Sequence, residues 1–314
     1  MGAFQNLSSS VTGIDLYAGG GGTTEGAVSA GVEMLWASNH KQITVDTHSL
    51  NHPEAVHVCQ DLQLADWNAV PSHDIMFASP CCQGHSHAAG KARRSKKADK
   101  SRATAWAVVD CLDIHRSPVG VIENTAGFLD WDLYPAWEFA LKSMGYSIGL
   151  HVLNLVDTGK SQSRERVYFV ITKSKNAIEL NIEKRERGSA RDIVDLNFEN
   201  YKWDLVSSKC AKTQMRVRNG RAQYGDVFMD ASYGSAISGR SIDAPLGTVM
   251  TVNKHYLVMG EYIRPLSIPE LADAQTFRSD YIWPESKTMA KEMIGNANPP
   301  YMAEMITKAL IKQF

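Results

Sequence analysis

The sequence predicts an α/β protein built on a doubly wound, mostly parallel sheet, with a second and smaller domain. Three observations lead to this prediction. Short apolar segments alternate with stretches of helical spacing over the first half of the chain, and a run of glycines follows the first apolar segment. Beyond about Lys173 the sequence becomes polar and basic and loses this alternation. Strands separated by helices are typical of parallel sheets covered on both faces.

The first predicted strand, residues 11–17, leads into the glycines of residues 19–22. A predicted helix follows at 23–30 and ends at Gly31, because glycine commonly terminates helices. Ligands of such sheets bind outside the carboxyl ends of the strands, which is where the glycine run falls. Further strands are expected at residues 32–37, 74–78, 119–122, 151–156 and 167–172, and further helices at 103–115 and 133–144.

The change of character along the chain predicts three segments. Residues 1–173 are expected to form the sheet domain, and residues 174–262, which are polar and rich in basic clusters and glycines, the smaller domain. Residues 263–314 return to helical patterning, and we expect them to rejoin the sheet domain.

The composition is ordinary for a globular protein, with 314 residues, 44% hydrophobic and 21% charged. A formal net charge of −1 means that any nucleic-acid surface must be local. Five cysteines, an odd number with two adjacent, argue against a disulfide framework and for a reducing compartment. We expect no signal peptide and no membrane span.

The glycine turn is a candidate ligand site, because a tight turn lets backbone amides approach a bound group. A turn without a ligand is the alternative, and the dinucleotide pattern G-x-G-x-x-G is not met. The second predicted strand leads to His40, where a carboxylate that holds a ribose is usual. Asp61 could accept a hydrogen bond from an adenine amine or could simply shape its own loop.

Two adjacent cysteines, Cys81 and Cys82, follow the predicted strand at 74–78. A cysteine at the end of a parallel strand is placed to act as a nucleophile, since the thiolate is strongly nucleophilic near neutral pH. A buried, unreactive cysteine is equally compatible with this position. Zinc binding with His85 and His87 is disfavoured, because zinc-binding cysteines normally occur as spaced pairs.

A basic run at residues 91–102 holds seven basic residues against one acid. Such a run is usually a solvated face, but beside a candidate nucleophile it favours a loop that contacts a phosphate backbone. Glu123 ends a predicted strand and could be a general acid or an ion-paired side chain. Arg164 and Arg166 alternate in an extended segment, so they could bind a phosphate or a carboxylate, or form a surface salt-bridge ladder.

Taken in order, these segments resemble the DNA cytosine-5 methyltransferases, including phage and prophage members. The resemblance extends from Asp15 to about Pro300, and six motifs occur in family order. The matching segments are residues 15–22 for D-L-F-x-G-x-G-G, 81–86 for P-C-Q-x-x-S, 123–125 for E-N-V, 162–166 for Q-x-R-x-R, 264–277 for R-x-L-(T/S)-x-x-E followed by L-Q-x-F, and 295–297 for G-N-A.

The resemblance implies a Rossmann-like methyltransferase fold with S-adenosylmethionine as cofactor. It implies that residues 1–173 bind the cofactor and that residues 174–262 recognise the target. The implied partner is double-stranded DNA, with no membrane and no metal, and the enzyme is expected to act as a monomer in the cytoplasm of a bacterial or phage-infected cell. The implied cofactor residues are Tyr17, Gly19, Gly22, His40, Asp61, Leu62 and Asn296, and the implied catalytic residues are Cys82, Glu123, Arg164 and Arg166.

The implied chemistry begins with addition of the Cys82 thiolate to carbon 6 of a cytosine that is flipped out of the duplex. Glu123 would protonate or hydrogen-bond ring nitrogen 3 and the exocyclic amine. Arg164 would contact the base carbonyl, and Arg166 would hold a loop or a carboxylate. The candidates for phosphate or guanine contacts in the variable region are Lys212, Arg216, Arg218 and Arg221.

The chain departs from the family pattern at several positions. Cys81 replaces the usual proline, so the assignment of the nucleophile to Cys82 depends on aligning Gln83. His40 replaces the ribose-binding acid, and Thr125 and Asn298 replace valines. Three other functions remain open at this stage: methylation of a transfer RNA, DNA binding without catalysis, and a nicotinamide-dependent oxidoreductase.

Overall fold

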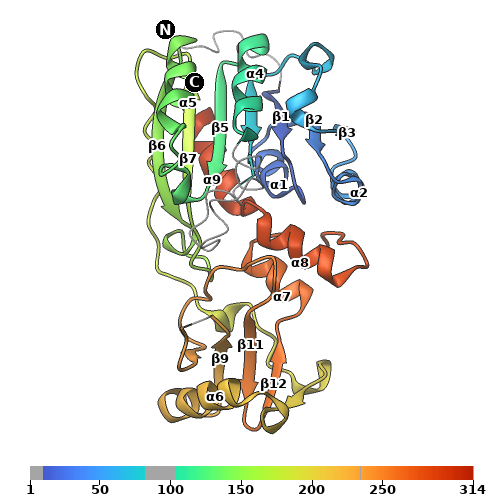
Figure 1. Cartoon of the computed structure of the whole chain (residues 1–314), viewed down its shortest axis with the longest axis vertical. Helices are drawn as coiled ribbons and strands as arrows, with labels where there is room; N and C mark the ends of the chain where they lie inside the picture. The colour runs from blue at the N-terminus through green and yellow to red at the C-terminus, as the bar shows by residue number, and fades with distance from the viewer. Residues whose placement is uncertain (1–9, 82–102, 234, 314) are drawn as a thin grey trace. The chain divides into compact units, whose positions relative to one another are not determined.

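The computed structural model describes residues 10–81, 103–233 and 235–313. The chain forms two compact units. Unit 1 comprises Met1–Leu153, Glu165–Ile182 and Ala297–Phe314, and unit 2 comprises Asn154–Arg164 and Glu183–Asn296. Each unit has its own sheet, as Figure 1 shows.

Unit 1 is built on a seven-stranded sheet with the strand order β3-β2-β1-β4-β5-β7-β6. The pairs β3–β2, β2–β1, β1–β4 and β4–β5 are parallel, and β5–β7 is antiparallel. The expected doubly wound, mostly parallel sheet is thereby confirmed. The strands are β1 (Thr12–Leu16), β2 (Glu33–Asn39), β3 (Val56–Cys59), β4 (Ile75–Ala78), β5 (Val119–Asn124), β6 (Ser147–Asn154) and β7 (Glu165–Thr172).

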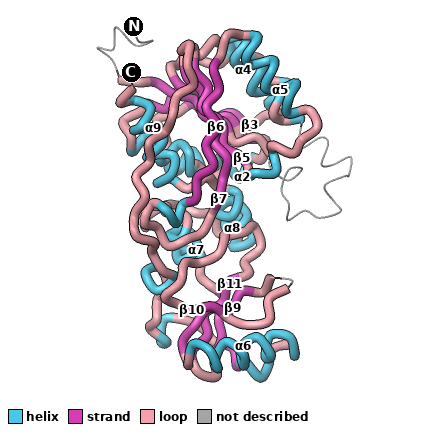
Figure 2. Tube along the Cα trace, turned by 90° about the vertical axis from the view of Figure 1, so that its left-hand side faces the viewer, coloured by secondary structure: helices cyan, strands magenta, loops and turns pink. Residues whose placement is uncertain are grey.

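Alternation along β1 explains how helices cover this sheet. Ile14 and Leu16 point into a large apolar core with residues of α4 and α5, whereas Asp15 between them meets Thr24 of α1. Figure 2 shows α4 and α5 side by side, and the two helices are in contact. The helices of unit 1 are α1 (Gly22–Ser29), α2 (Gln42–Asn51), α4 (Trp106–His115), α5 (Tyr134–Ser143) and α9 (Pro300–Ile311).

The helix that follows the glycine turn packs closely on the last helix of the chain. A Cβ atom at Gly26 of α1 would overlap the carbonyl oxygen of Pro300 and lie 2.7 Å from Cβ of Ala303 in α9. Only glycine therefore allows the two helices to approach this closely. The contact fixes the C-terminal helix in unit 1.

Unit 2 contains a five-stranded sheet with the order β10-β9-β11-β12-β8. Phe228, which is fully buried, forms a small core with Val217 of the helix α6 and with Val258 and Ile263 of the sheet. The elements of unit 2 are β8 (Asp204–Leu205), α6 (Ala211–Tyr224), β9 (Val227–Ala231), β10 (Arg240–Ser241), β11 (His255–Met259), β12 (Tyr262–Pro265), α7 (Ile268–Ala274) and α8 (Lys287–Asn296).

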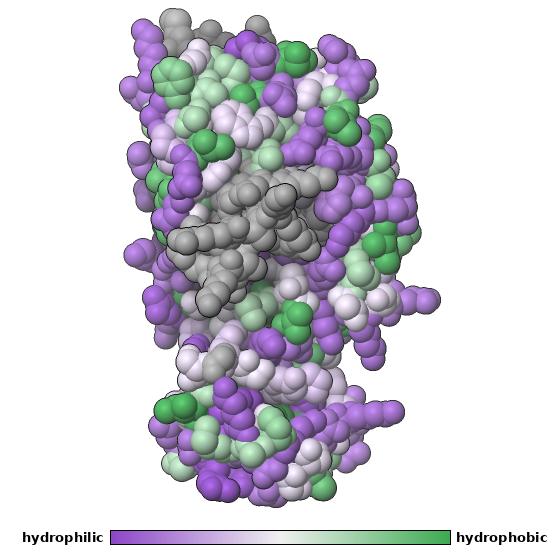
Figure 3. Space-filling view, viewed as in Figure 1, coloured by the Kyte–Doolittle hydropathy of each residue, from purple (hydrophilic) through white to green (hydrophobic). Residues whose placement is uncertain are grey.

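The observed division differs from the predicted one at the C-terminal segment, because residues 263–296 group with unit 2 and only Ala297–Phe314 join unit 1. β12 pairs with β11, and Arg264 forms a buried bidentate ion pair with Glu270 at the start of α7. These contacts hold β12 and α7 to the sheet of unit 2. On the face shown in Figure 3, hydrophobic residues are interspersed among hydrophilic ones.

Candidate active site

The carboxyl end of β1 opens into the glycine turn with an unusual backbone. Tyr17, Gly19 and Gly21 all have positive φ values, of 61°, 56° and 89°. The amide of Ala18 donates to the carbonyl of Ser38 at the end of β2, at 3.0 Å. Gly22 is buried and begins α1. The turn therefore lies where ligands of parallel sheets bind, as the sequence predicts.

A buried polar network lies behind this turn. Thr24 Oγ1 donates to Asp15 Oδ2 at 2.8 Å, and His48 Nε2 lies 3.0 Å from the same hydroxyl. His48 Nδ1 in turn lies 2.8 Å from Nε2 of His57 in β3. Burial raises the pKa of Asp15 to about 7, partly opposed by the Thr24 hydrogen bonds, and burial lowers the pKa of His48 well below its usual value.

The predicted cofactor residues occupy different environments around this edge. His40 is exposed, and Leu62 is buried. Asp61 Oδ1 accepts from the amide of Gln63 and so shapes its own turn. The pKa of the Tyr17 hydroxyl is raised, mainly by burial and further by the negative charge of Asp61. Asp61 therefore lies close enough to Tyr17 to act on it electrostatically. Among the described residues, Tyr17, Asp61 and the glycine turn are thus brought together.

Two buried polar atoms at this edge have no hydrogen-bond partner in the part of the chain that the structure describes. They are Oδ1 of Asp15 in β1 and Oγ of Ser38 in β2. Buried polar atoms normally have partners, so their presence here is compatible with a polar ligand. The edge therefore combines a glycine turn of positive φ with buried polar atoms behind it.

Asn296, a predicted cofactor residue, and Asn298, for which no role was predicted, lie in different units. Asn296 is exposed at the end of α8 in unit 2. Asn298 in unit 1 is buried; it accepts from the Tyr168 hydroxyl at 2.7 Å and donates to Thr23 Oγ1 at 3.1 Å. Sequence reasoning treated Asn298 only as a tolerated replacement for valine and missed this bridge between β7 and α1. A polar residue at an otherwise apolar position was the available signal.

Glu123 lies near the carboxyl end of β5 and forms an ion pair with Arg166 of β7. The distance from Arg166 Nε to Glu123 Oε1 is 2.9 Å, and the two side chains are 13% and 10% exposed. The antiparallel pairing of β5 with β7 brings these two positions to the same end of the sheet. Arg166 thereby holds a carboxylate, one of the two roles that the sequence suggested.

The cysteine pair follows β4, the strand beside β5. Cys82 lies outside the described residues, as do His85, His87 and the basic run at 91–102, whereas Cys81 is described and partly buried. Asn124 Nδ2 donates to the carbonyl of Pro80 at 3.1 Å, so the end of β5 holds the chain two residues before Cys82. Glu123 and the peptide of Pro80 therefore belong to the same part of unit 1.

Gln162 and Arg164, which match the first two specified letters of the Q-x-R-x-R pattern, lie in unit 2 and are buried. Gln162 Oε1 accepts from the amide of Val249, and its Nε2 donates to the carbonyl of Ala274. The Arg164 guanidinium donates to the carbonyls of Val249 and Gly295 at 3.1 and 3.0 Å. These bonds connect separate segments of unit 2, and the contact of Arg164 with a base stays a prediction.

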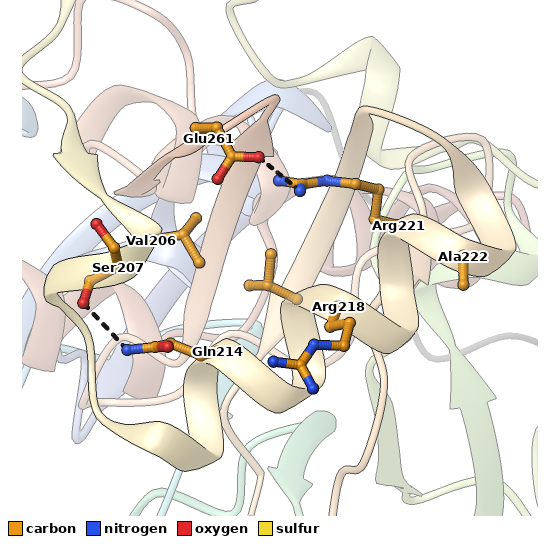
Figure 4. A pocket seen from close by; sticks show the side chains of 8 residues that line it. Val206, Ser207, Gln214, Arg218, Arg221, Ala222 and Glu261 are labelled. Carbon is orange, nitrogen blue, oxygen red and sulfur yellow. Dashed lines mark hydrogen bonds and ion pairs between the residues drawn. The ribbon is translucent and has the colours of Figure 1, made fainter.

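The arginines of α6 differ in their surroundings, since Arg216 and Arg221 form ion pairs within unit 2 and Arg218 is exposed. Arg216 is buried and forms a bidentate ion pair with Asp230, with both distances 2.8 Å, so the predicted contact of Arg216 with phosphate or guanine is wrong. Arg221 pairs with Glu261 at 2.6 Å. Arg218 is exposed and lines an open hollow beside these two residues, which Figure 4 shows.

Within residues 10–81, 103–233 and 235–313, no group of three His, Cys, Asp or Glu residues is arranged to hold a metal ion. In the same residues no helix has the length and apolar character needed to cross a bilayer.

Comparison with known proteins identifies the family. The family model described as C-5 cytosine-specific DNA methylase matches residues 11–312. Among curated proteins, the chain is similar to Type II methyltransferase M1.HphI of Haemophilus parahaemolyticus, with 27% identity over 96% of this chain and 87% of that protein. It is also similar to Type II methyltransferase M.NlaX of Neisseria lactamica, with 26% identity over 90% and 91%.

Solved structures show the same fold. A DNA modification methyltransferase encoded within an E. coli prophage matches with a TM-score of 0.72 and 19% identity over 96% of this chain and 99% of that chain. The S. pombe Dnmt2 methyltransferase matches with a TM-score of 0.67 and 16% identity over 96% and 99%. The fold is the Rossmann-like methyltransferase fold that the sequence predicts. Since the family model spans nearly the whole chain, this protein belongs to the C-5 cytosine-specific DNA methylases and is a DNA cytosine-5 methyltransferase.

Proposed function

We propose that this methyltransferase modifies a cytosine flipped out of a specific duplex sequence, with Cys82 as the nucleophile and S-adenosylmethionine as the methyl donor. The observation that carries the proposal is the grouping at the ends of β4 and β5. Asn124 holds the carbonyl of Pro80, two residues before Cys82, and Arg166 fixes the neighbouring Glu123. A nucleophile and an oriented carboxyl group are the two elements that cytosine activation needs.

Cys82 acts first. Its thiolate forms a bond to carbon 6 of the cytosine, and the electron pair of the 5,6 double bond moves onto carbon 5 and into the ring. Glu123 hydrogen-bonds or protonates ring nitrogen 3, which neutralises the developing negative charge. Arg166, paired with Glu123 at 2.9 Å, keeps that carboxyl group oriented. When bound, S-adenosylmethionine supplies an electrophilic methyl group to carbon 5. The proton on carbon 5 then leaves to a base, and Cys82 is expelled as the double bond re-forms.

The proposed cofactor site lies against the glycine turn. Tyr17, Gly19 and Gly22 supply the turn, and Asp61 and Leu62 lie in the loop after β3. The positive φ values of the turn and the unpartnered Oδ1 of Asp15 support this placement. His40 is proposed to contact the ribose without the charge of a carboxylate, and a cofactor contact of Asn296 stays a prediction from the sequence.

Unit 2 is proposed to recognise the duplex. A base inside a duplex cannot reach the proposed catalytic groups, so the cytosine must leave the stack at a cost of a few kcal/mol. Exposed Arg218 supports a contact with phosphate or a guanine edge, whereas buried Arg216 supports only the local fold. With DNA as substrate, the enzyme would act as a monomer in the cytoplasm of a bacterial or phage-infected cell.

Bisulfite sequencing of host DNA after expression tests the proposal and reveals the recognised sequence. We expect methylated cytosines in one short sequence context with the native chain and none with Cys82→Ser. Cys81→Ser serves as the matched control and should keep most of the activity. Loss of activity in Cys81→Ser with activity retained in Cys82→Ser would assign the nucleophile to the other cysteine. Methyl incorporation into transfer RNA but not DNA would contradict the duplex substrate.

A further inference from the structure

Thr104 accepts two hydrogen bonds from residues that lie far away in the sequence. The Tyr17 hydroxyl, directly after β1, donates to the carbonyl oxygen of Thr104 at 2.9 Å. The amide of Cys81, shortly after β4, donates to the Thr104 hydroxyl at 3.0 Å. Thr104 itself lies two residues before α4. A single threonine thus connects the glycine turn to the segment that carries the cysteine pair.

Both donors come from residues that differ from the corresponding letter of the family pattern, Tyr17 from phenylalanine and Cys81 from proline. The family turn reads D-L-F, and phenylalanine at position 17 would have no hydroxyl. The family motif reads P-C-Q, and proline at position 81 would have no amide hydrogen. A chain with both family residues could form neither bond to Thr104. The two departures therefore have a common structural consequence.

The amide of Cys81 belongs to the same peptide unit as the carbonyl of Pro80. That carbonyl accepts from Asn124 Nδ2 at 3.1 Å, while the amide donates to Thr104 at 3.0 Å. Both polar atoms of this peptide are thus held, one from the end of β5 and one from the start of the α4 region. Proline restricts the backbone because its ring locks φ. In this chain two hydrogen bonds, one at each polar atom of the Pro80–Cys81 peptide, restrict the same stretch of backbone.

The Tyr17 hydroxyl is suited to be a permanent donor. Burial is the main cause that raises the pKa of Tyr17, and the nearby Asp61 and Cys81 add to it, so the hydroxyl stays protonated at any physiological pH. Tyr17 also adopts a left-handed backbone with φ of 61°, which a non-glycine residue rarely does. Its hydrogen bond to Thr104 is one contact that holds it there.

We propose that Thr104 is a positioning residue for methyl transfer, which holds the Pro80–Cys81 peptide ahead of Cys82 in place of the rigidity that proline provides in the family. The proposal rests on the proposed function, in which Cys82 is the nucleophile. Thr104 does not touch the substrate. It acts by restricting where the backbone delivers the proposed nucleophile, and Tyr17 extends that restraint to the cofactor turn.

A mutant cycle between positions 81 and 104 tests the proposal in the full-length enzyme. Cys81→Ala removes the thiol and keeps the amide, whereas Cys81→Pro removes both and restores the family residue. Thr104→Val removes the hydroxyl acceptor in each background, and Thr104→Ser keeps it. The measured quantities are the rate constant of covalent adduct formation with duplex DNA that carries 5-fluorocytosine, at saturating S-adenosylmethionine, and the dissociation constant for the same duplex.

In the Cys81→Ala background we expect Thr104→Val to slow adduct formation about tenfold, the effect of losing one hydrogen bond worth about 1.4 kcal/mol. DNA affinity should change less than about twofold, and Thr104→Ser should restore most of the rate. In the Cys81→Pro background Thr104→Val should change the rate less than about twofold, because the amide is already absent. Equal slowing in both backgrounds, or a change in DNA affinity alone, would overturn the proposal.

Two further variants keep the test decisive. If Cys81→Pro does not fold, the comparison of Thr104→Val with Thr104→Ser in the Cys81→Ala background decides, since a role in folding alone would leave the adduct rate of the folded protein unchanged. Cys82→Ser separates the two proposals. Adduct formed by Cys82→Ser overturns the proposed function, whereas adduct lost in Cys82→Ser but insensitive to Thr104→Val overturns only the positioning role.

Discussion

Arg166 Nε lies 2.9 Å from Oε1 of Glu123, and both side chains are almost withdrawn from solvent. A charge-assisted bond in such surroundings fixes the orientation of the carboxyl group. The neighbouring residue, Asn124, holds the carbonyl of Pro80. Two consecutive residues at the end of β5 therefore have separate contacts, one at the carboxyl group proposed to meet the base and one at the chain that leads to the proposed nucleophile.

Arg166→Ala is expected to lower kcat by about 10- to 100-fold, because Glu123 loses the partner that orients it. DNA affinity should change little, and Arg166→Lys should fall between the two, since lysine keeps the charge but not the planar guanidinium. Arg187→Ala is the control, because Arg187 also pairs with an acid, Asp157 at 2.8 Å, but is 64% exposed. Steady-state kinetics on a methylatable duplex measure both effects, and equal losses in Arg166→Ala and Arg187→Ala would contradict this role.

Arg218→Ala should affect DNA binding, whereas Arg216→Ala should affect the stability of the fold. Arg218 is exposed, so its loss should weaken duplex binding and reduce the dependence of log Kd on log salt by about 1, with unchanged stability. Arg216 is buried with Asp230, so its loss should lower the free energy of unfolding by about 3 kcal/mol. Binding isotherms at several salt concentrations and urea unfolding separate the two. A salt slope unaffected by Arg218→Ala would remove this residue from the proposed interface.

Gly26→Ala is expected to destabilise the enzyme by about 1–3 kcal/mol, because its Cβ would overlap the carbonyl oxygen of Pro300. Val28→Ala, on the same helix at a side chain that is 48% exposed, is the control and should change stability by less than about 0.5 kcal/mol. Urea unfolding monitored by circular dichroism gives both values. If both variants unfold alike, α1 and α9 do not pack as closely as described.

Stability should depend on pH through Asp15 and His48. The folded pKa of Asp15 is about 7 and its unfolded value about 4, so between these values the folded state keeps a proton that the unfolded state has lost. Stability from this group is therefore full below about pH 4 and is lost as the pH rises towards 7. His48 has a lowered pKa and acts in the opposite direction, since its contribution is lost as the pH falls below about 6.5.

Asp15→Asn should remove the part of this dependence that Asp15 causes, so that stability no longer falls between about pH 5 and pH 7. The variant keeps His48 and its partner His57, whose Nε2 lies 2.8 Å from His48 Nδ1. The loss of stability below about pH 6.5 that His48 causes should therefore be unchanged. Asp46→Asn, at an exposed position of α2, is the control. Urea midpoints measured at half-unit pH steps give the profile, and an Asp15→Asn profile parallel to that of the native chain would contradict the assignment.

Much of unit 1 could be predicted because several of its strands, such as β4 and β5, are short, largely apolar segments that stand out from the polar residues around them. The strand at 119–122 and the helix at 133–144 agree with β5 and α5 to within two residues. α2, Gln42–Asn51, was not predicted, because its threonines, histidine and aspartate give little helical periodicity. β6 begins at Ser147, four residues before the predicted strand. It ends at Asn154, two residues earlier than predicted, because residues 155–157 form a 3-10 turn instead.

The sequence motifs predict which residues belong to the candidate site and in which order they occur. They do not predict which of these residues contact one another. A sequence motif names Glu123 and Arg166 without stating that they pair, because the pairing follows from the antiparallel contact of β5 with β7. At Arg216 the sequence led to a wrong prediction. A basic residue in a polar helix is expected to be exposed, but Arg216 is buried in an ion pair with Asp230 of the sheet. The Thr104 contacts could not be predicted, because they join β1, β4 and α4 across 87 and 23 residues.

The close contact of α1 with α9 also constrains how the chain folds during synthesis. α1 precedes the main segment of unit 2 in the sequence, and its packing partner, Pro300–Ile311, follows that segment. Unit 2 lies between them in the sequence, so a nascent chain can complete the core of unit 2 while α1 still lacks its neighbour. The part of unit 1 around the glycine turn therefore gains this neighbour only after unit 2 has been translated, although α1 itself is translated before unit 2.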